Sequence, residues 1–416
     1  MKLLVLADDL TGALDTGIQF VAAGADTRVI LNPQYPLKEL DPTIDVVVID
    51  TETRHIPGQK AYDLVHTIAE QAKELQIPCL YKKTDSGLRG NVGAELSAVL
   101  ETEGGQLHFI PAFPKTHRYT KNGIHFIDGT PVAESVFGKD PFNPVKFSSV
   151  KEIIHEQTKL PVFVVPEGKE PSEESGIFVY DAETDADIEK IAQMLQAKGK
   201  LNLLAGCAGF ASHLSPLLRF EQKKKHPIPS KKAFLLVCGS VNPITRKQVK
   251  EAVDSGKFTY LRVKPEQSLT PHWFESEQGK ESIRKWSNAL QQGKNCIIDT
   301  NDIPGEVSVA EYAKTQQGMD FDDIQQQIPK AMGELLQGLF ENGLDATVMV
   351  TGGDILMGMI RALDIGGITP IQELFTGTVL STVTIDGKEQ PLISKSGGFG
   401  NPDLLVQLLE KLGRKG

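Results

Sequence analysis

Two adjacent carboxylates, Asp8 and Asp9, directly follow a short apolar run near the start of the chain. The run, residues 3–6, is typical of a buried strand, and residues 12–23 are typical of a helix that ends before Gly24. One acid there could cap the helix. A pair could also accept or orient a substrate hydroxyl, or bind Mg²⁺ through water beside nucleotide phosphates. We predict Asp8 and Asp9 as catalytic residues, with their separate roles left open.

A second stretch, YKKTDSGLRGN at 81–91, gathers cations around small polar side chains in what is predicted to be one strand-to-helix loop. Such a combination suits the binding of a carboxylate or phosphate, and arginine can bind either group through two hydrogen bonds. The alternative is a solvated loop in which an acid or hydroxyl caps the next helix. The candidate anion-binding residues are Lys82, Lys83, Asp85, Ser86 and Arg89.

Basic residues also follow two other predicted strands. An acidic chain that binds an anionic metabolite needs a local basic pocket, and these positions would contribute to one. They are Arg54 and His55, with the neutral hydroxyl of Thr51 beside them, in the stretch 50–55, and Lys115, His117, Arg118 and Lys121 in the stretch 111–123, with His125 just beyond.

Three glycine-bearing turns follow apolar runs in the second half: CGSVNP at 238–243, VTGGD at 350–354 and KSGGFGNPD at 395–403. Glycine lets the backbone approach a ligand closely, and a helix that starts just beyond offers free N–H groups to a phosphate. Each turn alone could be a tight corner, but three together favour a phosphate or nucleotide site. The chain has neither a P-loop lysine motif nor GxGxxG, so a nucleotide would bind in another arrangement.

The elements that must position these residues alternate along the chain. Short apolar runs alternating with amphipathic segments predict βαβ units and a mostly parallel sheet, whose carboxyl-end edge is the usual ligand site. Strands are predicted at 3–6, 28–31, 45–50, 78–81, 107–110, 296–300 and in 347–354, and helices at 12–23, 58–75, 91–100 and 323–341.

The stretch EQKKKHPIPSKK, residues 221–232, is basic and contains two prolines, as is typical of a linker. A chain of 416 residues favours at least two domains. We therefore predict an α/β fold class with two α/β domains, 1–227 and 228–416. Their mainly parallel sheets are expected to face each other across a ligand cleft.

The formal net charge of −10 argues against nonspecific nucleic-acid binding. No apolar run approaches the roughly 20 residues of a membrane span, and no signal peptide is evident, so we expect a cytoplasmic protein with no membrane partner. The four cysteines form no CxxC pair and are expected to be free thiols. A homodimer is the default expectation.

Taken together, the motifs resemble the four-carbon acid sugar kinase family. LADDLTGALDTG, KKTDSGLRGN, CGS, TGGD and KSGGFG occur in the family's order over nearly the whole chain. The resemblance implies a sugar-acid-binding N-terminal domain and an ATP-binding C-terminal domain. It also implies transfer of phosphate from ATP, with Mg²⁺, to the 4-hydroxyl of acids such as D-threonate, D-erythronate or 3-oxo-tetronates. The continuation LDTGIQFVAAG looks closer to the threonate and erythronate kinases.

Carried over residue by residue, the resemblance implies that Asp8 or Asp9, Arg54 and residues 82–86 with Arg89 contact the sugar acid. This chain departs from the family pattern at two positions. Gly87 stands where threonine is usual, and Ile355 stands where threonine often follows the TGG-acid turn. The residues implied to surround ATP are Ser240, Gly352, Gly353, Asp354, Lys395, Gly397, Gly398 and Gly400.

Three alternatives remain: a 3-oxo-tetronate 4-kinase of the same family, an NAD-dependent oxidoreductase on a similar fold, and a non-catalytic sugar-acid sensor. The missing GxGxxG weighs against the oxidoreductase. The acids, cations and glycine turns together weigh against the sensor.

Overall fold

The computed structural model describes residues 1–140, 143–221, 231–396 and 398–413 of the chain. The chain divides into two compact units, Met1–Lys224 and Lys225–Gly416. Each unit has its own hydrophobic core. The predicted boundary at 227/228 and residues 222–230 of the predicted linker lie outside the described residues.

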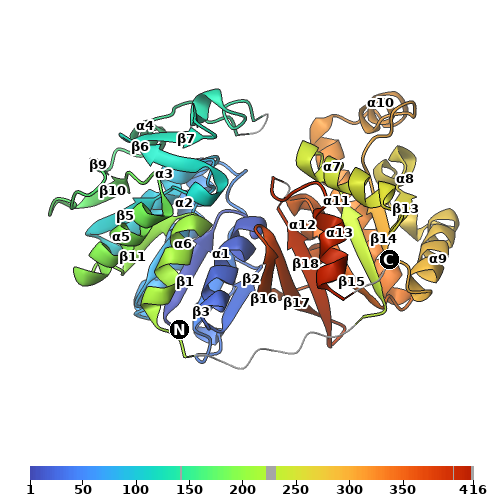
Figure 1. Cartoon of the computed structure of the whole chain (residues 1–416), viewed down its shortest axis with the longest axis horizontal. Helices are drawn as coiled ribbons and strands as arrows, with labels where there is room; N and C mark the ends of the chain where they lie inside the picture. The colour runs from blue at the N-terminus through green and yellow to red at the C-terminus, as the bar shows by residue number, and fades with distance from the viewer. Residues whose placement is uncertain (141–142, 222–230, 397, 414–416) are drawn as a thin grey trace. The chain divides into compact units, whose positions relative to one another are not determined.

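Parallel strands form the sheet of the first unit, in the order β2-β3-β1-β4-β11-β5-β10-β9 (Figure 1). Because neighbouring strands run the same way, their carboxyl ends lie at one edge. The strands are β1 (Leu3–Ala7), β2 (Thr27–Ile30), β3 (Val46–Asp50), β4 (Leu80–Lys83), β5 (Gln106–Ile110), β9 (Val162–Val165), β10 (Gly176–Tyr180) and β11 (Leu203–Gly206).

Helices cover both faces of this sheet (Figure 1). Helices α2, α3 and α4 pack over the face that presents Leu4 and Leu6 of β1, and α1, α5 and α6 pack together on the other. A small antiparallel sheet of β6 (Arg118–Lys121), β7 (Ile124–Ile127) and β8 (Thr130–Pro131) was not predicted. The helices are α1 (Leu10–Ala22), α2 (Gly58–Glu74), α3 (Val92–Glu103), α4 (Val150–His155), α5 (Asp185–Ala197) and α6 (Ala208–Leu214).

One local prediction in this unit is wrong in a way that matters for the site. The strand predicted at 78–81 is β4, which runs from Leu80 through Lys83, so Lys82 and Lys83 lie in the strand and not in the loop. Both residues pair with the end of β1, and their charged side chains are buried because each finds carboxylate partners. Helix α1 also starts earlier than predicted, at Leu10.

The second unit has strand order β13-β14-β12-β15-β18-β17-β16, parallel as far as β18 and antiparallel for β17 and β16. This confirms the prediction of two α/β domains with mainly parallel strands. The strands are β12 (Ala233–Cys238), β13 (Thr259–Arg262), β14 (Cys296–Asp299), β15 (Ala346–Thr351), β16 (Gly367–Phe375), β17 (Thr378–Ile385) and β18 (Lys388–Lys395).

Helices α7 and α13 cover one face of these strands, and α9, α11 and α12 pack on the other. The helix predicted at 323–341 is α11. It begins at Phe321, two residues earlier than predicted, and Asp320 caps its N-terminus. The helices are α7 (Pro243–Asp254), α8 (Pro265–Leu269), α9 (Glu277–Gln291), α10 (Val309–Tyr312), α11 (Phe321–Glu341), α12 (Gly353–Ala362) and α13 (Leu404–Lys411).

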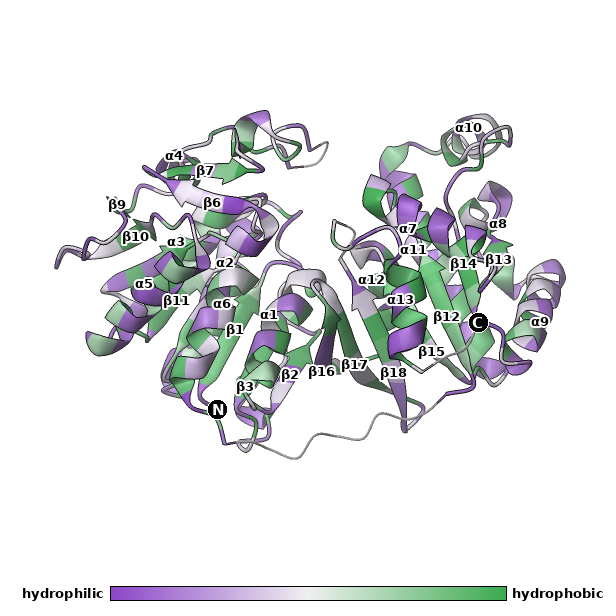
Figure 2. Ribbon diagram, in the orientation of Figure 1, coloured by the Kyte–Doolittle hydropathy of each residue, from purple (hydrophilic) through white to green (hydrophobic). Residues whose placement is uncertain are grey.

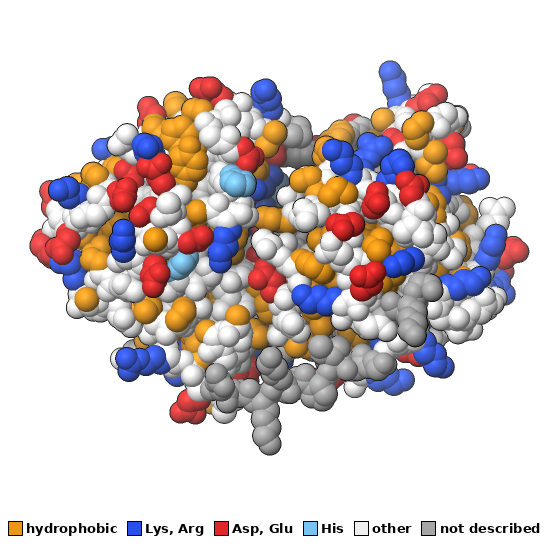
Figure 3. Space-filling view, in the orientation of Figure 1, with side chains coloured by type: hydrophobic (Ala, Val, Ile, Leu, Met, Phe, Trp, Pro, Cys, Tyr) orange, Lys and Arg blue, Asp and Glu red, His pale blue; other side chains and the backbone are white. Residues whose placement is uncertain are grey.

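Hydrophobic residues concentrate in the strands and on the inward faces of the helices (Figure 2). All four cysteines are buried and free, as expected. Within the described residues, no helix combines the length and apolar character needed to cross a bilayer. Basic and acidic side chains are interspersed on the face drawn in Figure 3.

Candidate active site

Three predicted stretches meet at the carboxyl edge of the first unit. Strands β3, β1 and β4 are neighbours, so the residues that follow them come together although they are far apart in sequence. Asp8 and Asp9 follow β1, the stretch ending in Arg54 follows β3, and the stretch 84–89 follows β4.

Arg54 and Lys83 hold the two aspartates. The Arg54 guanidinium donates from Nε to Asp8 Oδ2 at 2.8 Å and from NH1 to Asp9 Oδ2 at 2.8 Å. Lys83 Nζ donates to Asp8 Oδ1 at 3.1 Å and to Asp9 Oδ1 at 3.2 Å. The four side chains therefore form one network, in which each acid contacts both cations.

In this network burial and ion pairing shift the pKa values in opposite directions, and ion pairing has the larger effect. Burial acts to raise the pKa of Asp9, but the charges of Arg54 and Lys83 outweigh it and hold that pKa well below its usual range. Burial acts to lower the pKa values of Arg54 and Lys83, but the two aspartates outweigh it and raise both. Asp9, Arg54 and Lys83 therefore stay charged at neutral pH.

Asp9 also caps helix α1. Its Oδ1 accepts a hydrogen bond from the Gly12 backbone N–H at 3.1 Å. A Cβ on Gly12 would overlap the Lys83 ammonium, so glycine is required for the approach of Lys83 to the aspartates. The two functions considered for these acids, capping and a charged site, thus coexist in Asp9.

Lys82 points to the opposite face from Lys83, because successive strand residues alternate. Its side chain has no exposed surface and pairs with Glu95 Oε2 of α3 at 3.0 Å. Its ammonium also donates to the carbonyl oxygens of Leu6 and Lys83, at 3.0 and 2.8 Å. Through these bonds Lys82 connects α3 with β1 and β4.

Arg89 and Asp85 form a second charged pair in the loop after β4. Arg89 Nε donates to Asp85 Oδ2 at 2.6 Å, and Arg89 NH1 donates to Asp140 Oδ2 at 3.1 Å. Burial acts to raise the pKa of Asp85, but the charges of Arg89 and Arg54 lower it well below its usual range. This pair is therefore coupled electrostatically to the Asp9 network.

Arg118 completes the basic groups of this edge. Its NH1 donates to Ser86 Oγ, and its side chain is buried enough that desolvation lowers its pKa. His125 is also buried, bonded to Thr120 and to the Ser86 carbonyl oxygen, and burial lowers its pKa to about 4. The other predicted basic residues of this segment, Lys115, His117 and Lys121, are exposed.

Sequence reasoning missed three residues that shape this site. Phe137 and Asp140 contact Arg89, but they lie about fifty positions away in a segment without recognisable periodicity. Asp50 ends β3 with no exposed surface, and its Oδ2 has no hydrogen-bond partner among the described residues. The sequence feature that could have identified Asp50 was its position at the end of a predicted strand.

The glycine turns of the second unit also meet at one edge. They follow β12, β15 and β18, which are adjacent parallel strands. Gly352 has φ +102° and precedes α12, and a Cβ built on it would lie 3.4 Å from the Ser240 backbone nitrogen. Gly353 and Asp354 form the exposed first turn of α12, whose free N–H groups suit a phosphate.

Lys395 ends β18 at the same edge. Its ammonium donates to the Ser396 carbonyl oxygen at 2.9 Å and lies 3.5 Å from Thr245 Oγ1. Burial lowers its pKa to about 8. In the turn beyond it, Gly400 has φ +91° and a Cβ built on Gly398 would meet nothing within 4 Å, while Gly397 lies outside the described residues.

Both departures from the family pattern have a packing partner. A Cβ on Gly87 would come within 2.7 Å of the Phe137 ring. A Cβ on Gly239 would overlap Ile355, so the Ile355 side chain lies directly over the turn after β12. Phe137 and Ile355 occupy the space beside these two glycines.

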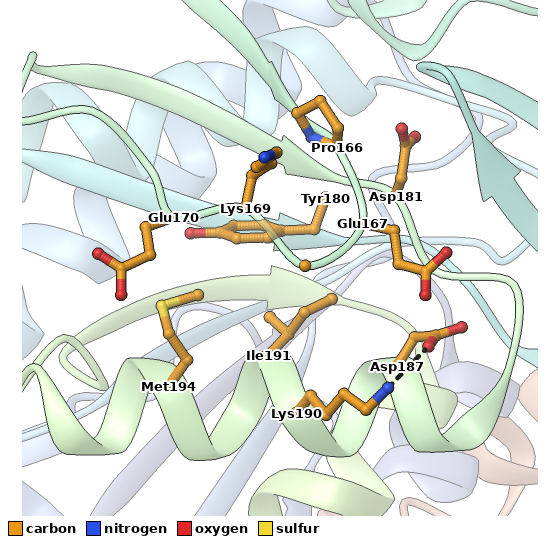
Figure 4. A pocket seen from close by; sticks show the side chains of 11 residues that line it. Pro166, Glu167, Lys169, Glu170, Tyr180, Asp181, Asp187, Lys190, Ile191 and Met194 are labelled. Atoms are coloured by element: carbon orange, nitrogen blue, oxygen red, sulfur yellow. Dashed lines mark ion pairs between the residues drawn. The ribbon is translucent and has the colours of Figure 1, made fainter.

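Two other features lie away from these strand ends. The pocket in Figure 4 is formed by the loop after β9, Tyr180 and α5, at the outer edge of the first unit's sheet, and none of the predicted residues lines it. His272 lies 2.9 Å from Glu275 and 3.2 Å from Glu334. One ligand atom from each of the three lies within 4.8 Å of the others, and His272 Nδ1 already hydrogen bonds to Glu275.

Comparison with known proteins bears on both units. The family model described as a sugar-binding N-terminal domain matches residues 3–214. The model described as a nucleotide-binding C-terminal domain matches residues 235–405. Together the two models cover most of the chain.

Relatives with assigned activities match over nearly their whole length. A D-threonate kinase of Salmonella typhimurium is 29% identical, covering 98% of both chains. A D-erythronate kinase of Heliobacterium modesticaldum is 26% identical, covering 99% of this chain and 97% of that one. A 3-oxo-tetronate kinase of Pseudomonas fluorescens is 26% identical, covering 98% and 96%.

A solved structure from Salmonella typhimurium LT2 shares the fold. Its TM-score is 0.80 at 21% sequence identity, and the match covers 98% of this chain and 99% of that one.

Proposed function

Because the chain belongs to the four-carbon acid sugar kinase family, we propose that it transfers the γ-phosphoryl group of ATP to the 4-hydroxyl of a four-carbon sugar acid. D-Threonate and D-erythronate are the substrates we favour, and a 3-oxo-tetronate is the alternative. The observation that carries the proposal for this site is the network of Asp8, Asp9, Arg54 and Lys83.

Asp9 is the member of the network that we assign to the substrate hydroxyl. Its side chain is 24% exposed, whereas that of Asp8 is 3% exposed, so a ligand can reach only Asp9 without rearrangement. A low pKa makes Asp9 a weak proton acceptor but a permanent anion. That suits a group that orients the hydroxyl by accepting its hydrogen bond, because phosphoryl transfer depends mostly on positioning and charge.

Of the remaining residues, some offer hydrogen-bond donors to the substrate carboxylate and others hold the contacting residues in place. Arg89, with Ser86 and Arg118 beside it, offers donors for the substrate carboxylate. Lys83 and Arg54 hold Asp9 in place. Lys82 is better suited to support than to contact, because its ammonium is enclosed by three oxygen partners.

The turns of the second unit would hold the nucleotide. Gly352 lets the backbone approach the phosphates, the N-terminus of α12 offers free N–H groups, and Lys395 supplies a cation. Ser240 lies beside Gly352 at the same edge. ATP supplies the phosphoryl group, and Mg²⁺ neutralises phosphate charge when bound.

The test is ADP release from ATP–Mg²⁺ with D-threonate, D-erythronate, L-threonate, L-erythronate and 3-oxo-tetronates. Turnover on one of the first two acids is the expected result. Turnover confined to a 3-oxo-tetronate would establish the alternative kinase. Acid binding without ADP release would establish a sensor, and reduction of NAD⁺ or NADP⁺ with a sugar acid would establish the oxidoreductase.

A further inference from the structure

Phe137 packs directly against the glycine of the DSG turn. A Cβ built on Gly87 would lie 2.7, 2.8 and 2.9 Å from three atoms of the Phe137 ring. Real Cβ contacts essentially never fall below 3.0 Å. A side chain at position 87 and the ring in its present place therefore exclude each other.

The same ring stacks with two guanidinium groups. Arg89 lies 5.0 Å and Arg118 lies 5.1 Å from the ring centroid, within the range of cation–π attraction. Arg89 is bonded to Asp85, and Arg118 donates to Ser86. The ring therefore stacks with two cations, each bonded to the DSG turn.

The backbone around Phe137 is fixed independently of the arginines. The Phe137 N–H donates to Ser135 Oγ at 3.1 Å, and the Phe137 carbonyl oxygen accepts from the Val145 N–H at 3.1 Å. Gly138 allows the close turn, since a Cβ there would overlap the Ala133 carbonyl oxygen. The backbone that carries the ring is thus held by its own segment, and the arginines pack against the ring.

We propose that Phe137 is a positioning residue for sugar-acid recognition, which sets the placement of Arg89 and Arg118 at the substrate carboxylate and requires glycine at position 87. This inference rests on the proposed function. The inference goes beyond the proposed function because it assigns a residue of the 132–140 segment a role in substrate affinity. Phe137 acts on the acid through the two arginines, so its loss should change the KM for the acid more than kcat.

The test uses the acid that the wild-type enzyme turns over and compares Phe137→Leu with Phe137→Tyr. Leucine keeps apolar bulk but removes the π-face, so the KM for the acid should rise on the order of tenfold while the KM for ATP stays unchanged. Tyrosine keeps the ring, so its KM should stay near the wild-type value. Phe147→Leu is the control, because Phe147 is 39% exposed and is also near this segment in sequence.

A second pair of variants tests the packing directly. Gly87→Thr alone should lower Tm and raise the KM for the acid, and adding Phe137→Ala should recover Tm relative to Gly87→Thr. Additive losses in the double variant, or an unchanged acid KM in folded Phe137→Leu, would overturn the inference while leaving the kinase intact. A wild-type enzyme inactive on the whole panel would instead overturn the proposed function, and this inference with it.

Discussion

The two adjacent acids differ in exposure although both lie in the bend between β1 and α1. Asp8 is enclosed by Arg54 and Lys83, while Asp9 shares those partners, caps α1 and keeps 24% of its side chain exposed. Ion pairing lowers the pKa of Asp9 against the effect of burial, so the group is an anion over the whole neutral range. Such a fixed anion suits the role of orienting the substrate hydroxyl that we propose for Asp9.

We expect Asp9→Asn to lower kcat by about 100-fold, which is the lower end of the range for general acid–base groups, because Asp9 is proposed to orient the hydroxyl and not to take its proton. The affinity for ATP should stay unchanged, because the nucleotide turns belong to the other unit. Steady-state kinetics with both substrates varied would measure this. Glu74→Gln, an exposed acid at the end of α2, is the control, and loss of ATP affinity in Asp9→Asn would contradict the division of roles.

We expect Lys395 to make nucleotide binding sensitive to pH. Burial lowers its pKa to about 8, so the fraction of ammonium falls as pH rises through that value. ATP stays fully ionised there, so its affinity should weaken between about pH 7 and 9 as the cation is lost. Isothermal titration of ATP across this range measures the effect.

The matched variants for this test lie on the same strand. Lys395→Met should bind ATP weakly and without the pH dependence, whereas Lys388→Met, at the exposed start of β18, should behave as wild type. A pH dependence that persists in Lys395→Met would show that another group titrates.

At the scale of elements, the candidate residues of each unit lie at strand ends and in the turns after them. Adjacent parallel strands bring the stretches after β3, β1 and β4 together, and they do the same for the turns after β12, β15 and β18. Glycine is needed where the turn approaches another backbone. Gly352 meets this condition, since it combines a positive φ with closeness to Ser240.

Gly352→Ala should weaken ATP binding and lower stability by about 1–2 kcal/mol, the cost of a left-handed or similar conformation for a residue with a Cβ. Gly343→Ala is a close control. Gly343 has φ +77° and nothing within 4 Å of a built Cβ, so it should lose similar stability with ATP binding unchanged. Equal ATP affinities in the two variants, measured with chemical denaturation alongside, would contradict a role for the Gly352 turn.

At the scale of the whole molecule, the predicted acid-binding and ATP-binding residues lie in different units with different cores. A ligand that binds only the folded state raises Tm, whichever unit binds it. We therefore expect the sugar acid and ATP each to raise Tm of the full chain when added alone.

A substitution in each unit should separate the Tm shift caused by the acid from the Tm shift caused by ATP. Asp9→Asn should reduce the shift caused by the acid and keep the shift caused by ATP, and Lys395→Met should do the reverse. Differential scanning fluorimetry of the full chain measures both. If either variant lost both shifts, the assignment of one ligand to each unit would be contradicted.

The fold class and several of the strands could be predicted from the sequence, because apolar runs and amphipathic segments repeat locally. The sequence also identified Asp8, Asp9, Arg54 and the 82–89 stretch as candidates that strand order could bring together. Tertiary structure decided which of these residues meet. Pairing of β4 with β1 carried the strand through Lys83, so alternation sent Lys82 to Glu95 and Lys83 to the aspartates.

Packing also placed the Phe137 ring against both Arg89 and Arg118, and it buried Asp8 while leaving Asp9 accessible. No local pattern carries such information, because contacts between distant segments depend on how whole elements pack.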